Sequence, residues 1–360
     1  ARLLWFRRHQ PATARRARTW VGVAELVGHA LTGRLATNAS LACRTMAFDV
    51  RSRTWDASLI ALAGFHTDLM PPLLPLGREV GGIAPEAATR HRIQAGTPVA
   101  IAGHDHLVGA IGAGVVRPGQ ALDSIGSAEA AMLVLDRATA DAAIGAAGFS
   151  VGCHAVDGRS YVIGGLQASG SFVDWVRRSI LDLDRDGGYA QFDALLALAP
   201  PGPSDIVAGP WLAGRSVPNP NRTIGASFAG LRPEHGRSDL ALAAVEAVAF
   251  ASRWIFDELE AVTGRRIARV RVIGGGSRNQ RWLGVKRATM PWRLELADDD
   301  ETVARGAALV GGLAGGAYGS VREAIARAGA PVRPVPIDRR LRTAYEAAYR
   351  ERFLPFAIRT

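Results

Sequence analysis

The amino-acid sequence predicts an α/β protein with a largely wound architecture. Apolar, β-prone runs alternate along the chain with longer segments whose apolar residues recur at helical spacing, and this alternation is typical of the α/β class. Of the 360 residues, 48% are hydrophobic and 21% are charged, which is the composition of a soluble globular protein. A chain of this length can form two domains, each with its own hydrophobic core.

Helices are expected where apolar residues recur three or four positions apart. These segments cover residues 14–31, 58–63, 106–112, 172–181, 189–198, 238–262, 280–290, 301–313 and 338–353. Gly33 closes the first segment in the manner of a C-cap, and the long helix is expected to end before Gly264.

Strands are expected where short apolar runs lie between turn residues. These runs cover residues 99–102, 121–125, 130–135, 148–155, 161–163 and 269–273. The second and third runs predict a hairpin whose turn is Gly126-Ser127-Ala128. The glycine-rich stretch from Gly112 to Gly119 predicts a boundary between a domain of residues 1–117 and a domain of residues 118–360.

Composition disfavours several classes of protein. The net charge is +10, but the basic residues are almost all arginines, scattered without a long basic run or interleaved aromatics, so no nucleic-acid partner is expected. No apolar run approaches the ~20 residues that span a bilayer, and no membrane association is expected. The two cysteines, Cys43 and Cys153, are too few for a disulfide framework or a structural zinc site, which predicts a reduced, cytoplasmic protein. Lys286, the one lysine, has no glycine-rich loop before it, which excludes a P-loop.

The segment Ala102-Gly103-His104-Asp105-His106 is the candidate catalytic segment. It follows a predicted strand and leads into a predicted helix, and ligands and catalytic groups collect in such loops of open α/β sheets. A carboxylate at the start of a helix is favoured in its ionised form, which can take a proton from a hydroxyl that attacks phosphorus. The alternative is that Asp105 only caps the helix. His104 and His106 are candidates for hydrogen-bonding to substrate hydroxyls, or they are ordinary surface residues.

Two glycine-centred turns in the second predicted domain are candidate ligand sites. Gly126 and Ser127 would present backbone N–H groups and a hydroxyl to an anion, although the same turn also suits a plain hairpin. Gly274-Gly275-Gly276 follows a predicted strand, where the absence of side chains lets a flat ligand approach the backbone. Asn279 can cap the following helix or bond a base edge; it stands where a dinucleotide fingerprint would need its third glycine, so the turn alone is a weak signal.

In this order, the segments resemble the FGGY carbohydrate kinases, a branch of the actin and hexokinase superfamily. The residues from Ala226 to Leu231, followed after seven residues by Asp239 to Glu246, are similar to the family's second signature. The remaining similar segments are Gly103–Gly114, around the family's catalytic aspartate; Asp123–Ser127, its second phosphate motif, with Ser127 where threonine is usual; and Gly170–Asp174 and Ile273–Asn279, which border the nucleotide. Asp174 departs from the glutamine that some members carry.

The resemblance implies an actin/hexokinase-like, ribonuclease H-like fold of two lobes, with ATP and Mg²⁺ as cofactors and a sugar or polyol as acceptor. It implies that Asp105 is the general base and that His104 and His106 contact the sugar. The residues implied at the nucleotide are Gly126, Ser127, Gly170, Asp174, Gly275, Gly276 and Asn279. The nearest members are xylulokinase-like, which suggests a ketopentose such as xylulose. A second copy of the chain is an open possibility as a partner.

The resemblance begins inside the family's first signature, at Arg2-Leu-Leu-Trp5, with arginine where lysine is usual. The family's opening Asp-x-Gly-Thr phosphate loop has no counterpart in this sequence, so the first lobe is expected to be incomplete. The chain alone is therefore expected not to turn over sugar at a useful rate. The alternative is a non-catalytic, nucleotide-binding remnant of a sugar kinase with a partner or regulatory role.

Overall fold

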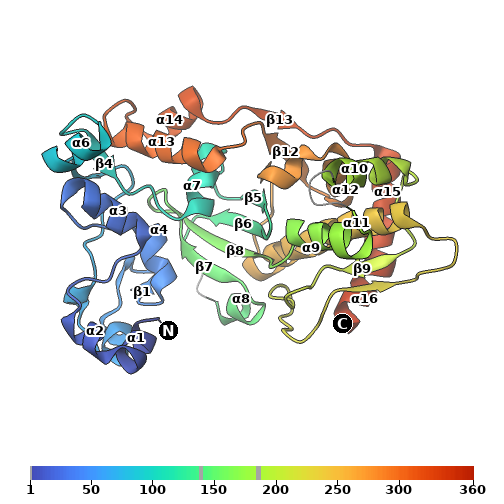
Figure 1. The fold of residues 1–360 in the computed structure, drawn as a ribbon, viewed down its shortest axis with the longest axis horizontal. Coiled ribbons are helices and arrows are strands. Elements are labelled where there is room, and N and C mark those ends of the chain that lie inside the picture. The colour runs from blue at the N-terminus through green and yellow to red at the C-terminus, as the bar shows by residue number, and fades with distance from the viewer. Residues whose placement is uncertain (1, 138–140, 184–187) are drawn as a thin grey trace.

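The computed structural model describes residues 2–137, 141–183 and 188–360, in which a seven-stranded mixed sheet lies between helices (Figure 1). The strand order is β13-β12-β11-β5-β6-β8-β7, with β5, β11 and β12 parallel and the other pairs antiparallel. The strands are β5 (Gln120–Ile125), β6 (Glu129–Leu135), β7 (Ser150–Cys153), β8 (Ser160–Leu166), β11 (Arg269–Ile273), β12 (Arg293–Ala297) and β13 (Val332–Pro334). The predicted α/β class and the predicted hairpin of β5 and β6 are confirmed.

Helices and short strands account for most of the remaining described residues. The helices are α1 (Arg2–His9), α2 (Pro11–Arg16), α3 (Val23–Thr32), α4 (Ala39–Ala42), α5 (Ala57–Leu62), α6 (Pro85–His91), α7 (Asp105–Gly112), α8 (Ala142–Ala146), α9 (Gly170–Trp175), α10 (Gly188–Leu198), α11 (Arg237–Thr263), α12 (Gln280–Thr289), α13 (Thr302–Ala314), α14 (Val321–Ala328), α15 (Arg339–Ala347) and α16 (Leu354–Arg359). Three antiparallel pairs stand apart from the large sheet: β1 (Phe48–Asp49) with β2 (Thr54–Trp55), β3 (Glu79–Gly82) with β4 (Pro98–Ala100), and β9 (Val207–Gly209) with β10 (Ser227–Ala229).

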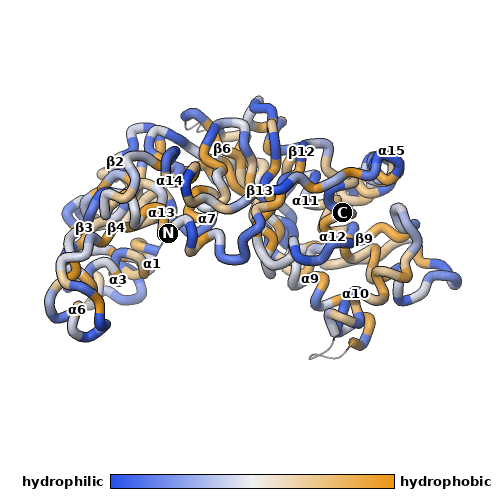
Figure 2. Tube along the Cα trace, turned by 90° about the horizontal axis from the view of Figure 1, so that it is seen from above, coloured by the Kyte–Doolittle hydropathy of each residue, from blue (hydrophilic) through white to orange (hydrophobic). Residues whose placement is uncertain are grey.

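Both faces of the large sheet are buried because successive residues of a strand point to opposite sides. Ala121 and Leu133 belong to a core that they share with α11 and α12. Leu122 and Met132, one position away, belong to a second core formed with α7, α13 and α14. Figure 2 shows apolar residues gathered around β6, with α3 and α6 at one end of a curved body and α10 and α15 at the other. No helix in the described ranges is both long and apolar enough to cross a membrane.

Helices α7 and α13 cross at very short range. A Cβ atom built on Gly112 would lie 2.1 Å from the carbonyl oxygen of Thr302, and one built on Gly306 would lie 1.9 Å from that of Val108. Side chains at either glycine would therefore force the helices apart. The contact fixes α7, which begins at Asp105, against a helix that flanks the large sheet.

Two predicted elements of the N-terminal part are wrong in extent. The helix predicted over residues 14–31 is interrupted: α3 begins at Val23, because Gly22 is its N-cap and the Glu25 carboxylate accepts a hydrogen bond from the Gly22 amide at 2.9 Å. Gly33 ends the helix as predicted. The strand predicted as buried over residues 99–102 is the half-buried β4, which ends at Ala100 and pairs with β3 outside the large sheet.

Strands β12 and β13 and helix α14 were not predicted from the sequence. Arg293-Leu-Glu-Leu-Ala297 alternates charged and apolar residues, and this period of two was the available signal for β12. The domain boundary between residues 117 and 118 stays a prediction.

Candidate active site

Asp105 lies where two cavities meet. One cavity, of about 660 Å³, is lined by the N-terminal part of the chain, including Trp20, Glu25 and Trp55. The other, of about 410 Å³, extends from Asp105 to the β5–β6 turn and β8. Asp105, His104 and Arg44 line both cavities, and the Asp105 side chain is 70% exposed. Its carboxylate can therefore contact molecules bound on either side.

The loop before α7 is held by hydrogen bonds from α4. Asn38 donates to the carbonyl of Ile101 at 2.9 Å, and the Ser40 hydroxyl accepts the His104 amide at 3.1 Å. Gly103, with φ of +127°, allows this approach, because a Cβ there would lie 2.4 Å from the Ser40 oxygen. These contacts and α7 therefore fix the position of Asp105. The sequence analysis predicted instead that Asp105 follows a strand of the large sheet, and this prediction is wrong.

Asp105 is not the N-cap of α7. His104 occupies the N-cap position, without a side-chain cap bond, and Asp105 is the first helical residue. The Asp105 Oδ1 atom accepts a hydrogen bond from the next amide, that of His106, at 2.7 Å. The carboxylate therefore satisfies one N–H group of the first helical turn, and the role of Asp105 as general base stays a prediction.

His104 and His106 lie beside this carboxylate and line the 410 Å³ cavity. His104 Nδ1 is 3.1 Å from Asp105 Oδ1, and the two imidazole rings are 5.6 Å apart. Burial lowers the pKa of His104 more than the Asp105 carboxylate raises it, so the imidazole is neutral at neutral pH. A neutral imidazole can both donate and accept hydrogen bonds from sugar hydroxyls. Contact of either histidine with a sugar stays a prediction.

The β5–β6 turn meets the start of α9. The Gly126 carbonyl accepts the Gly170 amide at 3.0 Å, and the Ser127 carbonyl accepts the amides of Ser169 and Ser171 at 2.9 and 3.0 Å. A Cβ on Gly170 would lie 2.6 Å from the Gly126 oxygen, so glycine is needed for this approach. The structure thus brings together Gly126, Ser127 and Gly170, and the first two are exposed.

The glycine turn after β11 packs against the end of β5. Gly274 has φ of +94°, and a Cβ there would lie 2.5 Å from the Ile125 carbonyl oxygen. A Cβ on Gly276 would lie 2.4 Å from Ile125 Cγ2, whereas one on the exposed Gly275 would meet no atom within 4 Å. Both glycine turns therefore lie at the carboxyl ends of parallel strands, and Gly275 faces open space that a ligand could occupy.

Two of the predicted nucleotide residues have protein partners. Asn279 caps α12 by accepting the Trp282 amide at 2.8 Å and donates to Asp193 Oδ1 of α10 at 2.5 Å. Asp174 pairs with Arg177 and Arg178 at 2.8 and 2.5 Å. Burial alone would raise the pKa of Asp174, but the two arginines outweigh it and lower the pKa. The cap role of Asn279 is confirmed, and contact of either side chain with a nucleotide stays a prediction.

A buried ion triad beneath these turns was missed by the sequence analysis. Lys286 of α12 has no exposed surface, and its Nζ atom lies 2.5 Å from Asp123 Oδ2 and 2.7 Å from Glu129 Oε1. The other Glu129 oxygen accepts the Ser169 hydroxyl at 2.8 Å. The triad joins the β5–β6 hairpin, the start of α9 and α12. A lone lysine in an arginine-rich chain, together with an aspartate inside an apolar strand, was the available signal.

The charges of the triad balance when one carboxyl is protonated. Burial would lower the pKa of Lys286, but its attraction to Asp123 and Glu129 raises it; burial would raise the pKa of Glu129, but Lys286 lowers it. Burial and the neighbouring Glu129 hold the pKa of Asp123 well above its usual value despite Lys286. Of the two carboxyls, Asp123 is therefore the one that holds a proton more readily, while Glu129 and Lys286 favour their charged forms. Nowhere in the described ranges do three or more His, Cys, Asp or Glu side chains form a metal site.

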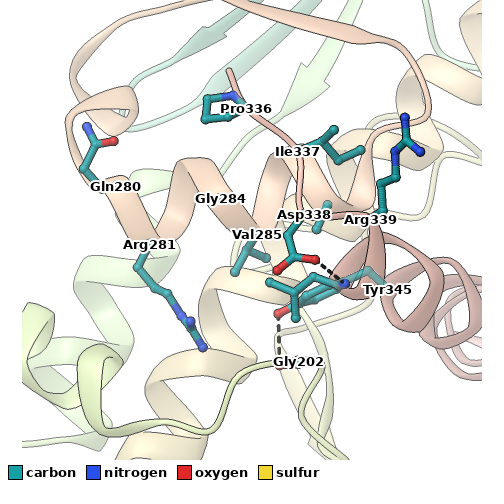
Figure 3. A pocket seen from close by; sticks show the side chains of 12 residues that line it. Gly202, Gln280, Arg281, Gly284, Val285, Pro336, Ile337, Asp338, Arg339 and Tyr345 are labelled. Carbon is teal, nitrogen blue, oxygen red and sulfur yellow. Dashed lines mark hydrogen bonds between the residues drawn. The ribbon is translucent and has the colours of Figure 1, made fainter. Parts of the chain in front are cut away.

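A third cavity, of about 670 Å³, lies against α12 and α15 and contains none of the predicted site residues (Figure 3). Tyr345 lines it and donates a hydrogen bond to the Gly202 carbonyl at 3.1 Å. The same hydroxyl lies 2.8 Å from the Oε1 atom of Glu246, which is 2% exposed and also accepts the Ser204 amide. This buried carboxyl belongs to the core of α11.

We expect Glu246→Gln to remove part of the pH dependence of stability. Burial raises the pKa of Glu246 to about 8, although Tyr345 and Ser204 partly oppose the shift. Because the folded state keeps a proton that the unfolded state releases above about pH 4.5, wild-type stability falls as the pH rises towards about 8. Glutamine is neutral throughout. Urea unfolding at several pH values in this window should show a smaller fall for the variant, and an identical fall for both proteins would contradict the prediction.

Comparison with known proteins identifies the fold. Residues 1–112 match the N-terminal domain, and residues 124–315 the C-terminal domain, of the FGGY family of carbohydrate kinases. The xylulose kinase of Bacillus subtilis (strain 168) is 25% identical over 322 residues, covering 89% of this chain and 63% of that protein. The gluconokinase of the same organism is 23% identical over 346 residues, covering 94% of this chain and 66% of that protein. The chain thus spans just under two thirds of the length of these relatives.

Solved structures of sugar kinases have the same fold. The crystal structure of xylulose kinase from Rhodospirillum rubrum superposes with a TM-score of 0.86 at 28% identity, covering 99% of this chain and 71% of that one. This confirms the sugar-kinase fold that the motifs predicted. Since the C-terminal family model alone matches more than half of the chain, this protein belongs to the FGGY family of carbohydrate kinases.

Proposed function

We propose that this chain carries the base and the nucleotide-binding turns of an ATP-dependent kinase that phosphorylates a sugar hydroxyl. The observation that carries the proposal is the position of Asp105 between two cavities. The 660 Å³ cavity suits the acceptor, and the 410 Å³ cavity leads to the glycine turn that would hold phosphate. A base that lies between acceptor and phosphoryl donor is the arrangement that phosphoryl transfer needs.

Asp105 accepts the proton of the acceptor hydroxyl as that oxygen attacks. The contacts with His104 and His106 both use Oδ1, which orients the carboxylate and leaves Oδ2 available for the proton. ATP, bound with Mg²⁺, supplies the γ-phosphoryl group and the positive charge that neutralises its oxygens. The exposed Ser127 would hold phosphate oxygens through its amide and hydroxyl, beside Gly126, whose own amide donates to the Ala128 carbonyl at 2.9 Å. Asp105 thus removes the proton of the acceptor hydroxyl, and the β5–β6 turn separately holds the phosphates.

The residues around the 410 Å³ cavity fit an ATP–Mg²⁺ complex. Its carboxylates are Asp105 and Glu129, and Glu129 is committed to Lys286 and Ser169. Among the described residues that line this cavity, Asp105 is therefore the carboxylate that could contact the metal ion. Water and phosphate oxygens usually supply most of the ligands of Mg²⁺. Outside this cavity, the open Gly275 would let the adenosine approach the backbone; Gly170, Asp174, Gly276 and Asn279, which the resemblance also implies at the nucleotide, line neither of the two cavities.

The acceptor is proposed to be a ketopentose such as xylulose. Relatives named xylulose kinase support this choice, and relatives named gluconokinase make a sugar acid the alternative. The acceptor cavity offers a buried carboxylate, Glu25, hydrogen-bonded to Thr37 at 2.5 Å, and the exposed Arg44. His104 lines the same cavity, and His106 lies beside it. These groups can bond several hydroxyls at once.

A coupled ADP-release assay over a panel of ketoses, polyols and sugar acids tests the proposal. It is run on the 360-residue chain and on a chimera that adds the opening strands and phosphate loop of a related kinase upstream. We expect sugar-dependent release from the chimera and far slower release from the 360-residue chain. If both proteins bind ADP but neither produces ADP from ATP when sugar is added, the result would favour a non-catalytic, nucleotide-binding role.

We expect Gly275→Val to abolish ADP binding without unfolding the protein. A side chain at this position meets no protein atom, so the valine would occupy the space where the nucleotide approaches. Gly284→Val is the matched control, because Gly284 is also exposed and open but lies along α12. Calorimetric titration with ADP should show lost affinity for the first variant and unchanged affinity for the second. Equal affinity in both variants would remove Gly275 from the nucleotide site.

A further inference from the structure

Cys43 and Cys153 lie side by side although 110 positions separate them. Cys43 begins the turn after α4, and Cys153 ends β7, so the pair joins the N-terminal part to the large sheet (Figure 1). The Cys153 amide donates to Cys43 Sγ at 3.4 Å, and the Cys153 thiol donates to the Val50 carbonyl at 3.7 Å. Because an amide nitrogen lies only ~1.5 Å from its own Cα, this contact brings Cys43 Sγ within reach of the partner side chain.

The two thiols differ in reactivity. Contact with the Cys153 side chain lowers the pKa of Cys43 to about 7 against the opposing effect of burial, helped by the Cys153 amide, the Tyr161 hydroxyl at 4.0 Å and Arg44. Contact with Cys43 and burial raise the pKa of Cys153, whose side chain has no exposed surface. Cys43 is half-buried. The attacking group is therefore the Cys43 thiolate, with Cys153 as the thiol that reacts second.

We propose that Cys43 and Cys153 form a site of reversible oxidation, in which a hydroperoxide converts the two thiols into a disulfide. The Cys43 sulfur attacks a peroxide oxygen, the O–O bond breaks, and the hydroxide released takes up a proton. The Cys153 sulfur then displaces hydroxide from the Cys43 sulfenic acid, and the Cys153 proton leaves with it as water. Two thiols lose two electrons in total, and hydrogen peroxide is reduced to two waters.

The disulfide would connect directly to the candidate active site. Arg44 follows Cys43 in the chain and lines both cavities beside Asp105. A covalent bond to β7 would fix the turn that carries this arginine. Formation of the disulfide does not depend on the proposed kinase activity, so failure of one proposal leaves the other open to its own test.

Peptide mapping of the whole chain after treatment with hydrogen peroxide tests the proposal. Because the sequence has no other cysteine, alkylation counts both thiols directly. We expect loss of both thiols, an intramolecular peptide linking Cys43 to Cys153, a higher midpoint of thermal unfolding, and recovery with dithiothreitol. Persistence of both thiols, disulfides between chains only, or oxidation of Cys43 beyond sulfenic acid with Cys153 still alkylated would overturn the proposal.

Single variants test the order of reaction. Cys153→Ser should leave a sulfenic acid on Cys43 that dimedone traps, and Cys43→Ser should leave Cys153 unmodified under the same treatment. The reverse pattern, with Cys153 oxidised alone and Cys43 inert, would contradict the assigned roles.

Discussion

Asp105→Asn should lower the turnover number for sugar phosphorylation by about 10²- to 10⁴-fold without lowering the melting temperature. Asparagine is nearly isosteric and can still accept the His106 amide through its oxygen, but it cannot take a proton from a hydroxyl. The loss should therefore appear in kcat more than in the KM for ATP. Steady-state kinetics on the sugar-dependent form of the enzyme, together with thermal unfolding, make the comparison.

Asp141→Asn is the matched control for that experiment. Asp141 is an exposed aspartate at the start of a helix, where it caps α8 by accepting the Ala143 amide at 2.9 Å, and it lines neither cavity. Its substitution should leave kcat unchanged. An unchanged kcat in Asp105→Asn as well would remove Asp105 from the role of base.

Lys286→Met should reduce the free energy of unfolding by about 3–5 kcal/mol, the usual cost of breaking a buried ion pair from one side. The substitution leaves the Glu129 carboxylate in a fully buried site without its cation, next to Asp123. Both carboxyls would then favour the protonated form, so the deficit should shrink as the pH is lowered. Urea unfolding of the wild type and the variant at several pH values measures the effect.

The double variant Lys286→Met/Glu129→Gln is the control for the lost charge. It removes the Glu129 carboxylate that the single variant leaves without its cation, so part of the lost stability should return. Glutamine can also still accept the Ser169 hydroxyl. A deficit in the single variant that neither changes with pH nor shrinks in the double variant would assign the effect to packing of the lysine stem.

Local signals predicted much of the fold. The hairpin around Gly126 and the strand that ends at Ile273 were predictable, because apolar runs and turn glycines lie within a few residues of each other. The start of α3 at Val23 was not, because it depends on Glu25 reaching back to Gly22. The sequence also placed β4 in the large sheet, since no local pattern shows which strand another will pair with.

In the candidate site, too, some features could be predicted from local motifs and others could not. Asp105 and the glycine turns could be identified from short motifs, and the structure brings Gly126 next to Gly170 and the turn after β11. The buried partners of Lys286 lie more than 150 positions away in the sequence, so that triad emerges only from the folded chain. The same holds for the cavities, whose walls come from segments far apart along the chain.

On the proposed function, the close crossing of α7 and α13 separates the choice of acceptor from the chemistry. Backbone contact at Gly112 and Gly306 fixes the helix that begins at Asp105 to the sheet that carries the glycine turns. Most of the 660 Å³ cavity that we propose for the acceptor, by contrast, is lined by residues 20–46 and Trp55. Substitutions in that wall can then alter which hydroxyls are recognised while the distance from the Asp105 carboxylate to the β5–β6 turn stays constant. One rigid frame can thus serve relatives with names as different as xylulose kinase and gluconokinase.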